Sequence, residues 1–270
     1  MKSTAILLLS GLTVLGSCHD KAETRDKKTR WLPDVTNKDH GPLKQKEFNG
    51  DFDEIEVSQS IDAEIIKSDV EKVVISAPAN IIDEVLVETR GGKVHIHYKT
   101  GIRVMNTNNV KAKIYAKDFV KLIANSAASV SIKDTFLQEK TDVEASSAAS
   151  ISGHLEANEL EISVDSSSSF EGKIWAVDLD VDASSAASIS ISGKSKNAEL
   201  SSSSGSSINA KGVIVENLKA DASSGASLEV SASSTVDAEA SSGGSVNVYK
   251  RGNVTTVKKE ESSGGSVTIQ

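Results

Sequence analysis

Residues 181–191 read VDASSAASISI, and this stretch decides the fold because close variants of it recur along the second half of the chain. The variants are NSAASVSI, SSAASISG, SSSSFEGK, SSAASISI, SSGSSINA, SSGASLEV, SSGGSVNV and SSGGSVTI. Their equivalent serines are Ser126, Ser147, Ser166, Ser185, Ser204, Ser224, Ser242 and Ser263, at intervals of 21, 19, 19, 19, 20, 18 and 21 residues. A period near 20 residues is typical of a solenoid in which each repeat forms one coil.

Apolar and polar residues alternate within each repeat, which is the period of a β-strand with one buried face. In one coil, the residues expected to point inward are Val181, Ala183, Ser185, Ala187, Ile189 and Ile191. The small residues among them predict a core that narrows at the serine. We expect the inward serines to bond to one another or to the backbone along the axis, since an unbonded buried hydroxyl is costly.

Stacking the coils about 4.8 Å apart gives each strand its hydrogen-bonding partners. The sequence therefore predicts an all-β fold, a single-stranded right-handed parallel β-helix with coils of about 20 residues, the handedness following from the general bias of parallel crossovers. It would span 48–270, with four or five degenerate coils in 48–119 and the serine-rich coils in 120–270. In the last coil, Lys259 and Glu261 take positions that are small or aliphatic elsewhere, which would discourage end-to-end stacking.

The N-terminus has the three parts of an export signal. Lys2 supplies a basic residue, residues 5–15 are an apolar run too short for a comfortable membrane span, and residues 15–18 read LGSC, which resembles a bacterial lipobox. We expect a signal peptide at 1–17, acylation of Cys18, and a charged tether over 18–47 with a reach of about 30 Å. His19 follows the cysteine, which favours sorting to the outer membrane, facing either the periplasm or the outside.

Composition excludes several classes of protein. The net charge of -8 argues against a nucleic-acid partner, because phosphate binding needs a concentrated basic surface. Aromatic residues make up only 4%, which favours a thin core of small aliphatic side chains, and the single cysteine allows no internal disulfide. No phosphate-binding or dinucleotide-binding motif is present, so no cofactor is expected. Gly91 and Gly92 predict a turn between two short strands.

Two groups of side chains are weak candidates for metal binding. Asp178, Asp180 and Asp182 alternate with aliphatic residues and should all face solvent, where they could bind Ca²⁺, act as acid and base on a polysaccharide, or simply keep the surface soluble. Trp175 is the only tryptophan near them, and we expect it to fall outside the regular coil. His95 and His97 share one face of a strand and would need a third ligand from a neighbouring coil.

Serine is abundant, but a serine nucleophile needs a positioned base. His154 follows Gly153 after one of the repeats, and no acidic partner for it is evident in the sequence. The repeats themselves account for the serines, and no catalytic residue is predicted.

The repeats SSxxS followed by Ile, Val or Leu, together with FNGDFDEIEVSQSIDAEII from Phe48 and VLVETRGGKVHIHY from Val85, resemble the head GIN domain family of autotransporter adhesin heads, common in lipoproteins of Bacteroidota. The resemblance covers about 48–270. It implies a right-handed parallel β-helix and an adhesive role, and it brings no catalytic residues with it.

The expected function is therefore that of a non-enzymatic lipoprotein of the cell envelope, held to the membrane by its lipid and presenting a rigid surface to a glycan or protein ligand. Two alternatives stay open: a β-helix enzyme acting on polysaccharides through surface carboxylates, and a purely structural periplasmic accessory protein. The sequence does not indicate the oligomeric state.

Overall fold

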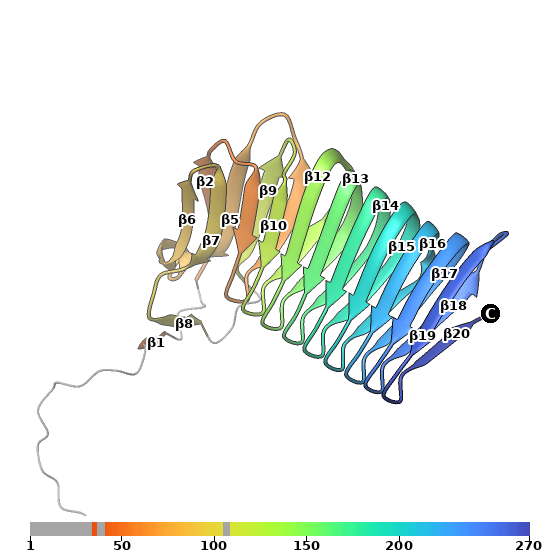
Figure 1. Ribbon diagram of the computed structural model, residues 1–270. Coiled ribbons are helices and arrows are strands. Elements are labelled where there is room, and N and C mark those ends of the chain that lie inside the picture. Colours follow the sequence, from red (N-terminus) through yellow and green to blue (C-terminus); the bar gives the residue numbers. More distant parts are fainter. Residues whose placement is uncertain (1–33, 37–40, 105–108) are drawn as a thin grey trace, which may run out of the picture. The chain divides into compact units, whose positions relative to one another are not determined.

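The computed structural model describes residues 34–36, 41–104 and 109–270, and residues 34–270 form one compact unit (Figure 1). The strands are β1 (Asp34–Thr36), β2 (Leu43–Asn49), β3 (Glu54–Val57), β4 (Asp62–Lys67), β5 (Lys72–Pro78), β6 (Val85–Arg90), β7 (Lys93–Tyr98), β8 (Ile102–Val104), β9 (Lys111–Ala116), β10 (Lys121–Ala124), β11 (Ser129–Ile132), β12 (Phe136–Ala145), β13 (Ser150–Val164), β14 (Ser169–Ala183), β15 (Ser188–Ser202), β16 (Ser207–Ala222), β17 (Ser227–Ala240), β18 (Ser245–Lys250), β19 (Thr256–Glu261) and β20 (Ser266–Ile269). The described part also contains one 3₁₀ turn, η1 (Ile82–Glu84), and no helix long and apolar enough to cross a membrane.

The predicted β-solenoid is confirmed. From β12 to β17 each strand pairs in parallel with the next one along the chain, so the windings lie side by side as in Figure 1. The register matches the sequence period: the first strand residues after each turn, which pair one with the next, are Ser129, Ser150, Ser169, Ser188, Ser207, Ser227, Ser245 and Ser266. Their spacing repeats the intervals between the equivalent serines of the sequence repeats.

Each winding has three flat segments separated by corners. In β13 the buried residues are spaced by two within a segment, and the alternation breaks near Gly153 and again at Asn158 and Glu159, where two exposed residues follow each other. The third corner is the turn between successive strands, such as 165–168 between β13 and β14. Its two central residues have positive φ, as at Ser166 and Ser167. This conformation suits a two-residue turn, and its backbone also hydrogen-bonds to the next winding.

The prediction that the equivalent serine of each repeat points into the core was wrong. Ser185 and its equivalents occupy the exposed tip of the turn, while the alanines on either side in the alternating frame, Ala183 and Ala187, are buried. The alternation is in register on both sides of the turn, so the sequence pattern alone gives no sign that the middle residue points outward. Buried serines lie elsewhere: Ser206 bonds the Ser202 hydroxyl at 2.9 Å and the Ala183 carbonyl oxygen at 2.7 Å, which satisfies its hydroxyl.

The core is a stack of aliphatic side chains with four buried phenylalanines, Phe52, Phe119, Phe136 and Phe170. Each buried Val, Leu or Ile contributes roughly 1.5–3 kcal/mol relative to exposure. Alanines fill the core beside most of the serine turns, as Ala183 and Ala187 do, and Val164 takes the position of Ala183 in the preceding winding.

The N-terminal part differs from the expected series of four or five degenerate coils. It contains two parallel windings, β3–β4 and β7–β9, and β3–β4 lies between β7–β9 and β10–β11, out of chain order. Three strand pairs in this part are antiparallel: β2 with β5, β5 with β9, and β6 with β7. The β6–β7 hairpin turns at Gly91 and Gly92, as predicted. Local sequence patterns do not specify strand direction or stacking order, so they gave no sign of this arrangement.

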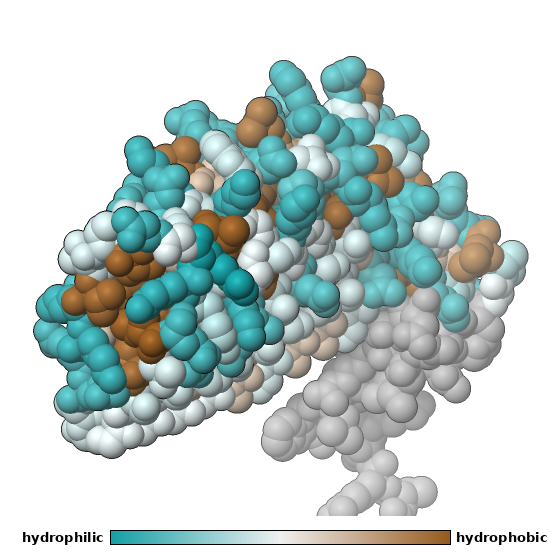
Figure 2. Space-filling view, turned by 90° about the vertical axis from the view of Figure 1, so that its right-hand side faces the viewer, coloured by the Kyte–Doolittle hydropathy of each residue, from teal (hydrophilic) through white to brown (hydrophobic). Residues whose placement is uncertain are grey.

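The last winding carries charges in place of core residues. Lys259 pairs in register with Ala238 and Glu261 with Ala240, as the comparison of the repeats predicted. The charged groups of Lys259 and Glu261 lie 3.0 Å apart. Figure 2 faces this end of the solenoid and shows apolar residues ringed by hydrophilic ones. Inward-pointing charges of this kind discourage the pairing of an open edge with another chain.

Candidate functional site

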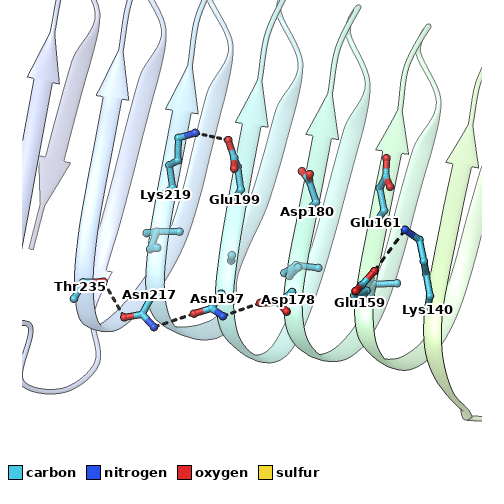
Figure 3. A pocket seen from close by; sticks show the side chains of 14 residues that line it. Lys140, Glu159, Glu161, Asp178, Asp180, Asn197, Glu199, Asn217, Lys219 and Thr235 are labelled. Atoms are coloured by element: carbon cyan, nitrogen blue, oxygen red, sulfur yellow. Dashed lines mark hydrogen bonds and ion pairs between the residues drawn. The ribbon is translucent and has the colours of Figure 1, made fainter.

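A groove runs along one face of the solenoid, across windings β12 to β17. It has a volume of about 580 Å³. It is lined by Lys140, Glu159, Leu160, Glu161, Asp178, Leu179, Asp180, Asn197, Ala198, Glu199, Asn217, Leu218, Lys219 and Thr235 (Figure 3). These residues come from equivalent positions of successive windings, so they form columns parallel to the axis at the strand spacing of about 4.8 Å.

The first column, which we call the amide column, consists of Lys140, Glu159, Asp178, Asn197, Asn217 and Thr235. Thr235 donates to Asn217 at 3.0 Å, Asn217 to Asn197 at 2.9 Å, and Asn197 to Asp178 at 2.7 Å (Figure 3). Each side-chain amide has two N–H donors and uses one of them in this chain. The ladder therefore fixes the orientation of the amides and leaves one N–H of each for a ligand.

The second column, the carboxylate column, consists of Glu161, Asp180, Glu199 and Lys219. Lys219 pairs with Glu199 at 2.5 Å, and at the other end of the groove Lys140 pairs with Glu159 at 3.5 Å. The two lysines compensate carboxylates toward the ends of the groove, so the middle, around Asp180, keeps a net negative charge.

Asp180 is the carboxyl most affected by this arrangement. Partial burial raises its pKa, the neighbouring carboxylates Glu199 and Asp182 raise it further, and Lys219 opposes them. A carboxyl with a raised pKa in a groove is a feature of functional sites, and it also occurs wherever like charges are stacked.

The floor between the two columns is apolar. Leu160, Leu179, Ala198 and Leu218 are buried and in register there. Ala198 lies between two leucines of adjacent windings, and its small side chain deepens the groove at that point. The groove thus combines a short apolar floor with two rows of hydrogen-bonding groups, which is the usual make-up of a binding site.

The sequence singled out Asp178, Asp180 and Asp182, and all three are exposed as predicted. The structure distributes them over different columns: Asp178 in the amide column, Asp180 in the carboxylate column, and Asp182 beyond the groove lining. Among the described residues, no group of three or more His, Cys, Asp or Glu side chains has the geometry of a metal site. The prediction from sequence did not include Asn197, Asn217 and Lys219. An alignment of the residues that precede each serine turn would have placed them in the same columns.

His95 and His97 do share one face of β7, and their rings stack at 4.2 Å. The Nε2 of His95 is 2.8 Å from the Ser58 hydroxyl and 3.6 Å from Glu56, and burial lowers the pKa of His95, with Glu56 opposing. In a serine hydrolase the acid bonds the other ring nitrogen, Nδ1, so this contact lacks the arrangement of a catalytic triad.

His154 has an acidic partner that the sequence did not reveal. Its Nε2 lies 3.2 Å from Glu156, and its Nδ1 is 2.9 Å from the Thr135 hydroxyl, which comes from the preceding winding. Glu156 is two residues further along β13, so the two side chains lie on the same face of the strand.

Cys18, the predicted lipidation site, lies outside the described residues, as do the predicted signal peptide and most of the predicted tether. Residues 43–47, which were assigned to the tether, belong instead to β2 and pair with β5.

Comparison with known proteins supports the fold. The chain is similar to crystal structures described as a putative adhesin from Parabacteroides merdae (TM-score 0.77, 18% identity, 85% of this chain and 97% of that chain) and from Parabacteroides distasonis (0.76, 21%, 88% and 100%). It is also similar to a structure described as a putative lipid binding protein from Parabacteroides distasonis (0.75, 17%, 87% and 99%). No curated protein matches the sequence.

A family model matches residues 51–252, which span all the windings from β3 to β17 and most of the chain. The chain belongs to the family described as "Putative auto-transporter adhesin, head GIN domain".

Proposed function

We propose that this protein is a lipid-anchored adhesin of the cell envelope whose groove binds an extended, hydroxyl-rich polymer lying along the solenoid axis. The observation that carries the proposal is the groove, in which hydrogen-bonding side chains repeat at the winding spacing along a shared apolar floor. A ligand that repeats along its own length can meet equivalent groups in each winding, so its affinity grows with the number of windings it contacts.

The chemistry of the columns favours hydroxyl groups as the ligand's polar groups. A hydroxyl both donates and accepts, so it can accept from the free N–H of Asn197 or Asn217 and donate to a carboxylate such as Glu161. The apolar floor suits the C–H face of a sugar ring, and the fixed orientation of the amides reduces the entropy lost on binding. A glycan strand therefore fits the groove better than a purely cationic partner would.

The anchor is part of the proposal. Cys18 would carry the lipid, and the tether would hold the solenoid off the membrane, which places a rigid binding surface within reach of polymers around the cell. Cys18→Ala should abolish incorporation of labelled fatty acid in vivo. Protease added to intact cells should then show whether the solenoid faces outward, as an adhesin requires, or inward, as an accessory role in the periplasm requires.

A glycan array probed with the mature chain tests the binding function. We expect binding to at least one surface polysaccharide, with an affinity about tenfold lower in Asn197→Ala/Asn217→Ala, a loss of roughly 1.4 kcal/mol. Asn209→Ala makes the same change on an exposed position of another segment of β16 and should bind like the parent. Equal loss in both variants, or binding to no glycan on the array, would count against the groove.

A polysaccharide hydrolase is the second candidate, and the raised pKa of Asp180 favours it. Carboxylates in adjacent windings are about 4.8 Å apart along the axis, close to the separation of about 5–5.5 Å in retaining glycosidases. This function requires release of reducing ends from a bound polysaccharide, with the activity lost in Asp180→Asn. Binding without any release of reducing ends supports the adhesin.

A further inference from the structure

A third column of outward-pointing side chains runs along the segment of the solenoid that follows the Gly153 corner. In register from β12 to β16 it consists of Leu137, Glu156, Trp175, Lys194 and Ile214. Trp175 therefore belongs to a regular winding, contrary to the expectation from sequence. None of the five side chains lines the groove, which lies beyond the next corner.

Three of these side chains are large, apolar and solvent-exposed: Leu137 at 69%, Trp175 at 42% and Ile214 at 39%. They occupy every second winding, so neighbouring apolar side chains in the column are about 9.6 Å apart, and one charged residue lies between each pair. Lys194 forms no ion pair with any described residue, and Glu156 has only the partly exposed His154 beside it. Exposed apolar side chains concentrated in one column indicate a contact surface.

If the column is set against a second copy of itself running in the opposite direction, the facing residues are complementary in charge and hydrophobicity. Reading outward from Trp175, one direction gives an acid and then a leucine, and the other gives a base and then an isoleucine. A two-fold axis beside Trp175, perpendicular to the solenoid axis, would bring the same column of a second copy against it in the opposite direction. Every residue then faces a suitable partner, which is the defining property of an isologous interface.

We propose that this column is a self-association surface, on which a second copy of the chain docks antiparallel. Trp175 packs against its own equivalent, Glu156 pairs with Lys194 of the other copy on both sides of the axis, and Leu137 packs against Ile214 at both ends. A parallel arrangement would instead set Glu156 against Glu156 and Lys194 against Lys194. The charges thus select the antiparallel orientation.

Charges flanking the column limit the strength of the association. Lys173 lies at one edge and Glu139 and Glu216 at the other, and the two-fold axis would bring like charges together there. They lie at the rim, where water and salt screen them. The segment is also narrow, so the dimer belongs with small, transient interfaces rather than with permanent ones.

Analytical ultracentrifugation of the full chain with Cys18→Ala, which removes the lipid, tests the proposal through charge reversal. The parent should show a monomer–dimer equilibrium. Glu156→Lys and Lys194→Glu should each weaken it at least about tenfold, since each places like charges at two contacts. An equimolar mixture of the two single variants should dimerise again, because each mixed pair restores both ion pairs. The double variant Glu156→Lys/Lys194→Glu should do the same by itself.

The mixture makes the test independent of folding, because a variant that failed to fold could not be rescued by the other. Trp175→Ala should weaken the dimer in every one of these backgrounds. A parent that stays monomeric at millimolar concentration, single variants that associate like the parent, or a mixture that stays monomeric would each overturn the proposal.

Discussion

Gly193→Ala should destabilise the solenoid by about 3–5 kcal/mol, the sum of a backbone strain term and a separation of two windings. Gly193 has φ +133°, a region that residues with a side chain rarely adopt, and occupying it costs roughly 1–3 kcal/mol. A Cβ at this position would lie 1.8 Å from the carbonyl oxygen of Ile174 in the preceding winding, against an ordinary contact of at least 3.4 Å.

Relieving that overlap requires the two windings to separate locally by about the missing 1.6 Å. Backbone hydrogen bonds of the ladder do not survive such a displacement, and two of them contribute about 1 kcal/mol each. The damage should be local, since each winding contacts mainly its two neighbours.

Gly205→Ala is the matched control. Gly205 lies at a turn tip with φ +71° and open space around its Cα, and the equivalent residue of the preceding winding is Ala186, with φ +61°. The left-handed conformation costs an alanine roughly 1–2 kcal/mol, partly offset by about 0.4–1 kcal/mol from the restricted unfolded chain. Urea denaturation followed by far-UV circular dichroism should therefore separate the free energies of unfolding of the two variants by at least about 1.4 kcal/mol. Equal stability of the two variants would refute the close approach of the windings at Gly193.

Three further predictions follow from particular side chains. Lys259→Ala/Glu261→Ala should promote end-to-end assembly, visible by electron microscopy as rods longer than the parent's, because the inward charges of the last winding are removed. Asp180→Asn should raise the free energy of unfolding at neutral pH and leave it unchanged in acid. The raised pKa means that the folded protein holds the Asp180 proton more tightly than the unfolded chain does. The carboxylate therefore lowers stability as pH rises through the folded pKa. His95 behaves in the opposite way, because its lowered pKa gives stability that is present above pH 6.5 and lost as pH falls through the folded pKa. His95→Gln should therefore flatten the dependence of the unfolding midpoint on pH over that range.

The winding architecture could be predicted because the information is local and repeated. Every serine-rich segment specifies the same turn, and the spacing of Ser150, Ser169 and Ser188 in the structure is that of the repeats in the sequence. The outward position of Ser185 could not be predicted in the same way. The turn preserves the alternation on both sides, and only the positive φ of its two central residues moves the serine to the tip.

The candidate site was predicted in part. The alternation around Asp180 showed that the carboxylates face outward, but the groove depends on side chains from five other windings, including Asn197 and Asn217. Their hydrogen-bonded chain is a consequence of register, and a shift by one residue would turn both amides away from it. The antiparallel N-terminal strands depend on pairing between distant segments, which no local pattern encodes.

Distances between turn tips test the central claim, the stacking of successive windings, most directly. Nitroxide spin labels on cysteines introduced at Ser166 and Ser242, four windings apart, should be about 19 Å apart when measured by pulsed electron paramagnetic resonance. Labels at Ser147 and Ser263, six windings apart, should be about 29 Å apart. Narrow distributions that grow in proportion to the number of windings are the expected result. Broad distributions, or a longer pair no further apart than the shorter one, would contradict a stacked solenoid.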